Sequence, residues 1–340
     1  MTEIAIVILN WNSKNYLEKF LPALIENSKL PNVDIYIADN GSQDGSVEFL
    51  KSTYPQINLI EFSENHGFTG GYNKALQQIE ARYYLLLNSD IEVTPNWLEP
   101  LKEIMGRDKN IAACMPKIKS YDKPEFFEYA GAAGGYIDKY GYPFCRGRIM
   151  DIVEEDRGQY NDEKEIFWAT GACMMVRAEV FHQLGGFDND FFAHMEEIDL
   201  CWRMQNAGYK IYYTHKSAIY HIGGGTLPNE SPFKLFLNFR NNLYLLYKNL
   251  PKKHLFKTLS IRMLLDCTSG LIYLTKGTPK KFLSVIKAHF MFFKNYSNLK
   301  KKRKEIPGNN KSLPQQLVLK SMLYAFFIHK KKYYRQLIDK

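Results

Sequence analysis

The sequence of 340 residues lacks several features that mark particular protein classes. Its five cysteines are odd in number and include no CxxC pair. We therefore expect neither a structural zinc site nor a disulfide framework, and a reducing compartment fits best. The apolar run at residues 4–9 has no basic region before it and is too short for a secretory signal. No uncharged apolar run reaches the length of a membrane-spanning helix.

Glycine is missing from the segment LNWNSKN at residues 9–15. A nicotinamide-dependent oxidoreductase would carry GxGxxG after its first strand, so this class is disfavoured. Acidic residues are scarce near the carboxyl end. Residues 230–340 hold 24 Lys and Arg against 4 Asp and Glu, whereas residues 1–229 hold 21 against 32. We expect an acidic catalytic domain at 1–228 and a basic helical region at 229–340 that sits near an anionic partner.

Short β-branched apolar runs alternate with helical patterns through the first ninety residues. The predicted strands are 4–10, 34–40, 58–63 and 82–90, and the predicted helices are 15–27, 46–54 and 69–79. This alternation predicts an α/β fold with a mostly parallel sheet covered by helices on both faces. Residues 110–162 look like extended loops with short strands. Later segments predict a strand at 166–177, helices at 177–187 and 196–209, and two short strands at 210–225.

Polar side chains follow three of the predicted strands where each strand ends. Asp39 follows one and Asp90, in LLLNSD, follows another. Ligands of open α/β sheets bind beyond the carboxyl ends of the strands. A single carboxylate at Asp90 suits a hard cation that also binds a substrate diphosphate, and Asp39 suits hydrogen bonds from a base or ribose. Turn or N-cap roles remain the alternative for both aspartates.

Three acids, Glu196, Glu197 and Asp199, occur at the start of one predicted helix. A partly buried carboxylate there suits a general base, although acids in a first turn also simply favour the helix dipole. His221 is a candidate second metal ligand, with an ordinary core or surface histidine as the alternative. The glycines of ENHGFTGGYNKA suit a phosphate approached by backbone amides, or a plain loop-to-helix connection. These glycines are Gly67, Gly70 and Gly71.

The basic region predicts helices at 232–249, 254–275, 279–299 and 314–339. Arg262 and Asp266 would be costly at mid-depth in lipid, so an interfacial helix is expected instead of a spanning one. One such helix would carry five apolar residues near one face: Phe282, Val285, Ile286, Phe290 and Phe293. Lysines 280, 281, 287 and 294 would snorkel beside it, and KKKRK at 300–304 would add a basic patch. A solvated helical bundle and a nucleic-acid-binding tail remain alternatives.

As an ordered set, several motifs resemble family 2 glycosyltransferases with the GT-A fold, in particular the bacterial rhamnosyltransferase-like branch. The motifs are VILNWNS (7–13), IADNGSQDGS (37–46), ENHGFTGGYNKAL (64–76), LLLNSDIEV (85–93), EDRGQYNDE (155–163), ATGACMMVRAEVF (169–181), GGFDNDFFAHMEEIDLCWR (185–203), HIGGG (221–225) and FRNNLYLLYKN (239–249). The likeness covers about residues 4 to 250.

The resemblance implies roles for individual residues. Asn10, Trp11 and Asp39 would contact the base and ribose of a nucleotide-sugar, and Asn73 would lie near the diphosphate or sugar. Asn88, Ser89 and Asp90 occupy the position of the DxD motif. Because the first acid is replaced by Asn, Asp90 would hold the metal with His221. The base would be Glu197 or Glu196, where the family usually has an aspartate.

The same resemblance implies an inverting hexosyltransferase that depends on a divalent cation, Mg²⁺ or Mn²⁺. Its donor would be linked to dTDP or UDP, and rhamnose is the leading sugar. The acceptor would be a polyprenyl-linked glycan of cell-surface polysaccharide synthesis, such as O-antigen. Another hexose with a soluble or protein acceptor is the alternative. We expect a cytoplasmic enzyme on the inner face of the plasma membrane, bound there by the basic region, and no nucleic-acid partner.

Overall fold

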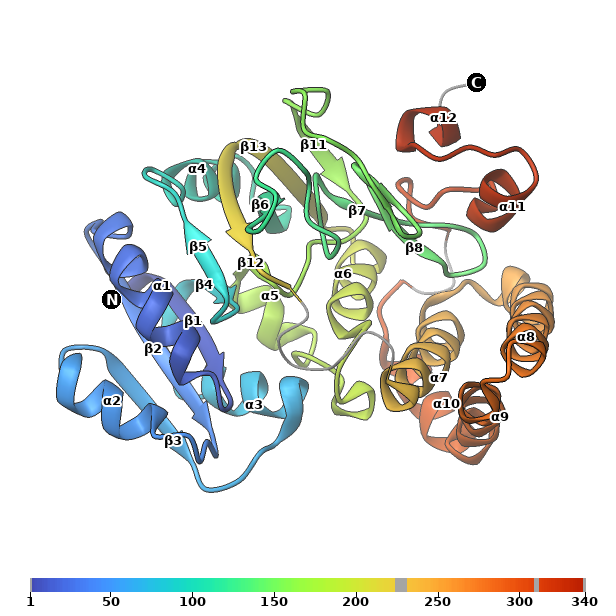
Figure 1. Cartoon of the computed structure of the whole chain (residues 1–340), viewed down its shortest axis with the longest axis horizontal. Coiled ribbons are helices and arrows are strands. Elements are labelled where there is room, and N and C mark those ends of the chain that lie inside the picture. Colours follow the sequence, from blue (N-terminus) through green and yellow to red (C-terminus); the bar gives the residue numbers. More distant parts are fainter. Residues whose placement is uncertain (1, 224–230, 309–311, 339–340) are drawn as a thin grey trace.

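A computed structural model describes residues 2–223, 231–308 and 312–338 and confirms the predicted α/β class (Figure 1). The strands are β1 (Thr2–Asn10), β2 (Val33–Asn40), β3 (Asn58–Phe62), β4 (Ala81–Leu87), β5 (Ile91–Val93), β6 (Ile111–Ser120), β7 (Gly135–Ile137), β8 (Pro143–Cys145), β9 (Arg148–Ile149), β10 (Ile152–Val153), β11 (Glu163–Ile166), β12 (Cys173–Arg177) and β13 (Lys210–His221). The helices are α1 (Lys14–Asn27), α2 (Ser46–Thr53), α3 (Gly67–Leu76), α4 (Glu99–Arg107), α5 (Ala178–Gln183), α6 (Glu196–Asn206), α7 (Pro232–Asn249), α8 (Lys252–Thr275), α9 (Pro279–Lys294), α10 (Tyr296–Glu305), α11 (Met322–Phe327) and α12 (Tyr334–Ile338).

The central sheet follows the order β11-β13-β6-β12-β4-β1-β2-β3, and β5 pairs with β13. Strands β3, β2, β1 and β4 are mutually parallel, as predicted from the βα alternation. Strand β12 runs antiparallel between β4 and β6. The carboxyl ends of β1, β2 and β4 therefore lie next to one another at one edge of the sheet.

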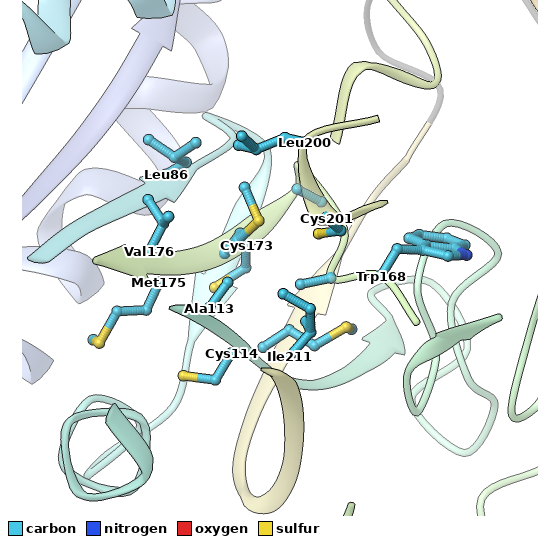
Figure 2. Packing of buried hydrophobic residues seen from close by; sticks show 14 of the residues in the cluster. Leu86, Ala113, Cys114, Trp168, Cys173, Met175, Val176, Leu200, Cys201 and Ile211 are labelled. Carbon is cyan, nitrogen blue, oxygen red and sulfur yellow. The ribbon is translucent and has the colours of Figure 1, made fainter. Parts of the chain in front are cut away.

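Both faces of this sheet are covered. Every residue from Ile4 to Ile8 of β1 is buried, on either side of the strand. Helix α3 packs on β1 and β2, α5 packs on β4 and β12, and α4 packs on β6 and β13. Figure 2 shows side chains of β4, β6, β12, α6 and β13 filling the core beside the antiparallel strand, including Leu86, Val176 and Cys201.

Two predictions within the domain are wrong in detail. The segment expected to hold loops and short strands contains β6, a ten-residue strand in the middle of the sheet. The rest of that segment does contain short strands, which form a second, antiparallel sheet in the order β10-β9-β8-β7. The two strands expected at 210–225 are one strand, β13, with an irregular register between Thr214 and Ala218.

The carboxyl-terminal region is helical, as predicted, but its last part differs. Helix α7 matches the predicted segment, while the expected helix at 279–299 divides into α9 and α10. Only the short helices α11 and α12 occur within residues 312–338, where one long helix was expected. Figure 1 places α7 to α10 together, on the opposite side of the molecule from β3. Within the described ranges, no helix is both long and apolar enough to cross a bilayer.

The predicted domain boundary at residues 228 and 229 lies outside the described residues. On its carboxyl side, α7 contributes Leu243, Leu245 and Leu246 to the same buried cluster that contains the sheet residues. The division into two domains therefore stays a prediction, and α7 packs as part of the main core.

Candidate functional site

The polar residues expected at the strand ends do meet at the carboxyl edge of the sheet. Asn10 of β1 pairs in register with Asp39 of β2. The Asn10 side-chain amide donates to Asp39 Oδ1 at 2.8 Å, and the backbone N–H of Ser42 donates to Asp39 Oδ2 at 2.9 Å. Each carboxylate oxygen can accept two hydrogen bonds, so Asp39 keeps acceptor capacity for a ligand hydroxyl or N–H. Asn10 is itself buried and orients this carboxylate, while Trp11 beside it is 42% exposed.

Asp90 lies at the same edge and contacts His221. Strand β5 pairs with the end of β13, which sets Ile91 opposite His221. His221 Nε2 lies 3.1 Å from Asp90 Oδ1. Burial alone would raise the pKa of the Asp90 carboxyl, but the hydrogen bond and charge of His221 hold this pKa below its ordinary value. The predicted pair is therefore brought together by strands more than a hundred residues apart in sequence.

A third group, Glu128, was not predicted. Its Oε2 lies 3.5 Å from His221 Nδ1, an ion-pair distance without hydrogen-bond geometry. Burial would lower the pKa of His221, yet the carboxylates of Asp90 and Glu128 raise it to about 10. Glu128 also accepts the backbone N–H of Ala130, which fixes its carboxylate. His221 thus contacts Asp90 through Nε2 and Glu128 through Nδ1. Metal-binding histidines are commonly arranged in this way, with one ring nitrogen at the metal and the other oriented by a carboxylate.

The neighbours of Asp90 join this edge to the loop after β1. Asn88 Nδ2 lies 3.5 Å from His221 Nε2, and Ser89 donates through Oγ to Ser13 Oγ at 3.2 Å. The backbone N–H of Asn88 donates to the carbonyl of Ala172 at 2.9 Å. The segment around Ala172 is also the one that approaches Glu197, because a Cβ at Gly171 would lie 3.9 Å from Glu197 Cβ.

Glu196 and Glu197 occupy the first turn of α6, as predicted. Each has a buried Oε2 with no hydrogen-bond partner among the described residues. Burial raises the pKa of Glu197 to about 7, against the lowering effect of backbone N–H groups. Burial, with the neighbouring Glu197 and Asp199 carboxylates, raises the pKa of Glu196 further above its ordinary range. An unpaired carboxylate with a pKa near neutrality is suited to accept a proton.

The backbone before these acids is strained. Phe192, His194 and Met195 all have positive φ angles, of 65°, 69° and 72°. Non-glycine residues in such conformations cost on the order of 1–3 kcal/mol each and persist only where surrounding contacts hold them. Strain of this kind clusters at ligand-binding and catalytic segments, which supports a functional role for the loop that leads into Glu196.

Helix α7 supplies the contacts that hold this strained loop. The Asn241 side-chain amide lies within donating distance of the carbonyls of Phe191, Ala193 and His194, at 2.8–3.0 Å. The Arg240 guanidinium donates to the carbonyls of Asp190 and Phe191. Neither residue was predicted as functional, although FRNN at 239–242 was the visible signal in the sequence.

A buried ionic network fastens α7 to the loop and to α6. Lys248 donates to Asp188 at 2.6 Å and to Asp199 at 2.9 Å, and Arg203 also binds Asp199. Lys302 of α10 pairs with Asp188 and Asp190. Asp199 is thus a structural acid, and part of the predicted KKKRK patch faces the protein.

Gly71 and Asn73 have packing contacts that explain them without a ligand. Gly71 lies in α3, where a Cβ would approach Leu9 of β1 within 2.7 Å, so the glycine permits close helix–sheet contact. Asn73 donates to the carbonyl of Phe187 and accepts its N–H. Gly186 has φ of +67°, and a Cβ there would meet Asn73 Oδ1 at 2.6 Å. Gly70 and Asn73 line a pocket of about 490 Å³ whose lining includes neither Asp90 nor Glu197.

A divalent cation fits the Asp90–His221 pair only with further ligands. Within residues 2–223, 231–308 and 312–338, no three His, Cys, Asp or Glu residues are grouped as metal ligands. One carboxylate and one imidazole leave coordination positions for diphosphate oxygens and water, as Mg²⁺ and Mn²⁺ sites in transferring enzymes often do. A histidine ligates through an unprotonated nitrogen, so binding at Nε2 displaces a proton from His221.

Comparisons with known proteins identify the family to which this fold belongs. The family model of glycosyl transferase family 2 matches residues 5–185. The N-acetylglucosaminyl-diphospho-decaprenol L-rhamnosyltransferase of Mycobacterium tuberculosis is 25% identical over 236 residues, which cover 65% of this chain and 76% of that protein. The dTDP-rhamnosyl transferase RfbF of Shigella flexneri is 22% identical over 306 residues, covering 85% of this chain and 94% of that protein.

A solved structure supplies the fold comparison. The structure of GalNAc-T7 with UDP, GalNAc and Mn²⁺ aligns with a TM-score of 0.59 at 15% identity, covering 75% of this chain and 49% of that chain. At this identity the likeness concerns the fold alone, and the predicted GT-A architecture is confirmed.

Proposed function

Because the chain belongs to glycosyl transferase family 2, in its rhamnosyltransferase-like branch, we propose that it transfers rhamnose with inversion from a dTDP-linked donor to a polyprenyl-linked glycan. The observation that carries this proposal is the Asp90–His221 pair at the sheet edge that also holds Asp39, with Asn88 bonded to the segment that approaches the unpaired acid Glu197. The names of the two relatives support rhamnose, the nucleotide and the lipid-linked acceptor.

In this proposal the donor lies across the ends of β1, β2 and β4. Asp39 accepts hydrogen bonds from the base or ribose, and the exposed Trp11 ring covers the nucleoside. Asn10 acts through Asp39 by holding its carboxylate. Contacts of Gly70, Gly71, Asn73, Asn88 and Ser89 with the donor stay predictions, and Gly71 and Asn73 have packing contacts that explain them without a donor.

Asp90 and His221 would hold a divalent cation, which when bound neutralises charge on the departing diphosphate. Glu128 would keep the His221 ring in place through Nδ1. The GalNAc-T7 structure contains Mn²⁺, which supports a divalent cation here without fixing which one.

Glu197 is the proposed base. It accepts the proton of the acceptor hydroxyl while that oxygen attacks the anomeric carbon and the bond to the diphosphate oxygen breaks. Its pKa of about 7 suits this task, whereas burial and the neighbouring carboxylates raise the pKa of Glu196 well above its ordinary value. Glu196 is also more buried than Glu197, so Glu197 is the more accessible of the two acids.

The test is a donor screen that measures released nucleoside diphosphate across dTDP-, UDP- and GDP-sugars, with Mg²⁺, Mn²⁺ or EDTA. We expect acceptor-dependent release from dTDP-rhamnose that EDTA abolishes. Release from another hexose donor with a soluble or protein acceptor would instead favour the alternative transferase. Metal-independent release would contradict the role of the Asp90–His221 pair.

We also propose that the enzyme acts at the cytoplasmic face of the plasma membrane, because polyprenyl-linked glycans are bilayer components. The nucleic-acid-binding alternative is disfavoured because exposed aromatic and aliphatic residues of the basic region follow helical spacing instead of lining a basic groove.

A further inference from the structure

Helix α8 buries polar and small side chains and exposes apolar ones, which is the reverse of an ordinary surface helix. Its buried residues recur every four positions and are polar or small: Thr258, Arg262, Asp266 and Gly270. Its exposed side carries large apolar residues, among them Phe256 at 85% and Leu264 at 67% exposed. A helix packed on a globular core in water normally shows the opposite arrangement.

The buried charges of α8 are fully engaged by the protein. Arg262 Nε donates to Asp266 Oδ1 at 2.7 Å, and Arg262 Nη1 donates to Asn242 of α7 and to the carbonyl of Tyr140. His289 of α9 lies 3.5 Å from Asp266 Oδ2. The mid-helix charges that would be costly in lipid, Arg262 and Asp266, therefore face inward, while the exposed Lys253 and Lys257 lie in the first two turns of α8, where their long side chains can reach a polar surface.

Helix α9 packs beside α8 and also exposes apolar residues, although its own buried side is mostly apolar. A Cβ at Gly270 would lie 3.3 Å from the Phe282 ring, which shows how closely the two helices pack. Val285 is buried and Phe282 is only partly exposed, so the predicted apolar face is rotated. The residues that face solvent follow a spacing of three and four: Leu283, Ile286, Phe290 and Phe293.

Lysines border this exposed apolar row. Lys280, Lys287 and Lys294 recur every seven residues, and their helical positions fall along one side of the row from Leu283 to Phe293. All three are exposed. Long basic side chains placed this way can reach phosphate groups while the apolar residues beside them enter the acyl region.

We propose that this surface binds the interfacial layer of a bilayer rich in anionic phospholipid without spanning it. We define the α8–α9 face by six exposed side chains, Phe256, Leu264, Leu271, Leu283, Phe290 and Phe293. Figure 1 shows both helices at the outer edge of the molecule, away from β1 to β3. An exposed apolar area of this kind marks a docking surface, and the lysines select an anionic partner.

A second copy of the chain is a poorer occupant. Residues 230–340 carry 24 basic and 4 acidic side chains, so two such regions would repel each other on close approach. The inference deepens the proposed function by placing the enzyme on the bilayer that holds a lipid-linked acceptor. Vesicle binding can be measured without transferase activity, so each proposal can fail alone.

The test is flotation of the full chain with phosphatidylcholine vesicles that contain or lack phosphatidylglycerol. The variant Leu283→Ser/Phe290→Ser/Phe293→Ser is expected to lose at least about 30-fold in partition coefficient. The variant Lys280→Gln/Lys287→Gln/Lys294→Gln is expected to lose about 100-fold, since each lysine near an anionic surface contributes about fivefold. Its matched control is Lys29→Gln/Lys51→Gln/Lys109→Gln, three exposed lysines of the sheet domain, which should bind like wild type.

The inference is overturned if the serine variant partitions like wild type while its circular dichroism melt is unchanged. It is also overturned if wild type binds neutral vesicles as tightly as anionic ones. Sedimentation without vesicles gives a third arm: a dimer lost in the serine variant would assign the face to a second copy. Tighter, salt-sensitive binding to DNA than to anionic vesicles would assign it to nucleic acid.

Discussion

The sheet edge and the α8–α9 face distribute polar and apolar side chains in opposite ways. At the sheet edge, apolar strands lie inside and polar groups emerge at their ends, as Asp39 and Asp90 do. On α8, the charges of Arg262 and Asp266 lie inside and apolar residues point outward. The first arrangement suits a soluble, charged ligand, and the second suits a surface that is itself apolar with an anionic border.

The largest effect is expected from Asp90→Asn, which changes the site at the sheet edge and leaves the α8–α9 face intact. Asp90→Asn keeps the shape of the side chain and removes its charge, so we expect turnover to fall at least about 1,000-fold because the diphosphate loses its cation. Vesicle binding should stay unchanged. The control is Asp151→Asn, an exposed carboxylate with no part in the site. Retained turnover in the Asp90 variant would remove Asp90 from the mechanism.

Glu197→Gln tests the proton transfer at the same edge. Transfer should fall about 100- to 1,000-fold, whereas the donor affinity measured by calorimetry should stay close to wild type. For wild type, kcat should rise with pH around a midpoint near 7, because the base must be deprotonated. Glu196→Gln is the matched variant, and a larger loss there would assign the base to Glu196.

The raised pKa of Glu197 also predicts a pH dependence of folding. A carboxyl whose pKa is raised in the fold stabilises it while protonated, and that contribution is lost as the pH rises from about 4.5 through about 7. Melting temperatures of wild type should therefore decline more across this window than those of Glu197→Gln. Parallel curves for the two proteins would show that the carboxyl is not held in this way.

Asn241 tests whether the helical region reaches the catalytic edge. Asn241→Ala removes the amide donor shared by the carbonyls of Ala193, His194 and Phe191, of which Phe191 keeps Arg240, so we expect about a 10- to 100-fold loss of kcat and about 2 kcal/mol of stability. Asn241→Asp has a similar shape but opposes carbonyls with a carboxylate, and it should be at least as damaging. Unchanged kcat in a folded Asn241→Asp protein would separate the strained loop from catalysis.

The smallest effect is expected on the α8–α9 face, where substitutions at an exposed and a buried position of α9 can be compared. Leu283→Ser on the outer face of α9 should change the free energy of unfolding by less than about 0.5 kcal/mol, because the side chain is exposed. Val285→Ser, two residues further and fully buried, should cost about 2–3 kcal/mol. Urea unfolding in the absence of lipid measures both, and equal losses would mean that Leu283 is packed against the protein.

The sequence predicted those parts of the fold that local pattern determines. Continuous apolar strands and their polar ends located Asp39 and Asp90, because strand direction and sheet order bring the ends together, while the amphipathic pattern located Glu196 and Glu197 at a helix start. It missed β6, which contains Pro116 and whose partners β12 and β13 come much later in the chain. It missed Glu128 because only the fold sets this glutamate beside His221.

In the helical region too, the sequence did not predict features that depend on contacts between distant segments. The apolar positions of α9 were recognised, but which of them face inward depends on α7 and α8, so Val285 was placed on the wrong side. Lys302 and Arg303 looked like surface charges within KKKRK, yet Lys302 binds Asp188 and Arg303 donates to the carbonyls that end α7. Charge counts alone do not distinguish a docking lysine from an internal one.

Three consecutive residues of α7 serve both regions. Arg240 and Asn241 hold the backbone before Glu196, and Asn242 accepts a hydrogen bond from Arg262 of α8. An engineer who exchanges the terminal helices between related transferases would therefore need to place the junction after this tripeptide and keep a matching arginine in the grafted helix. A chimera joined before it would inherit the α8–α9 face and lose the side chains that hold its own loop before Glu196.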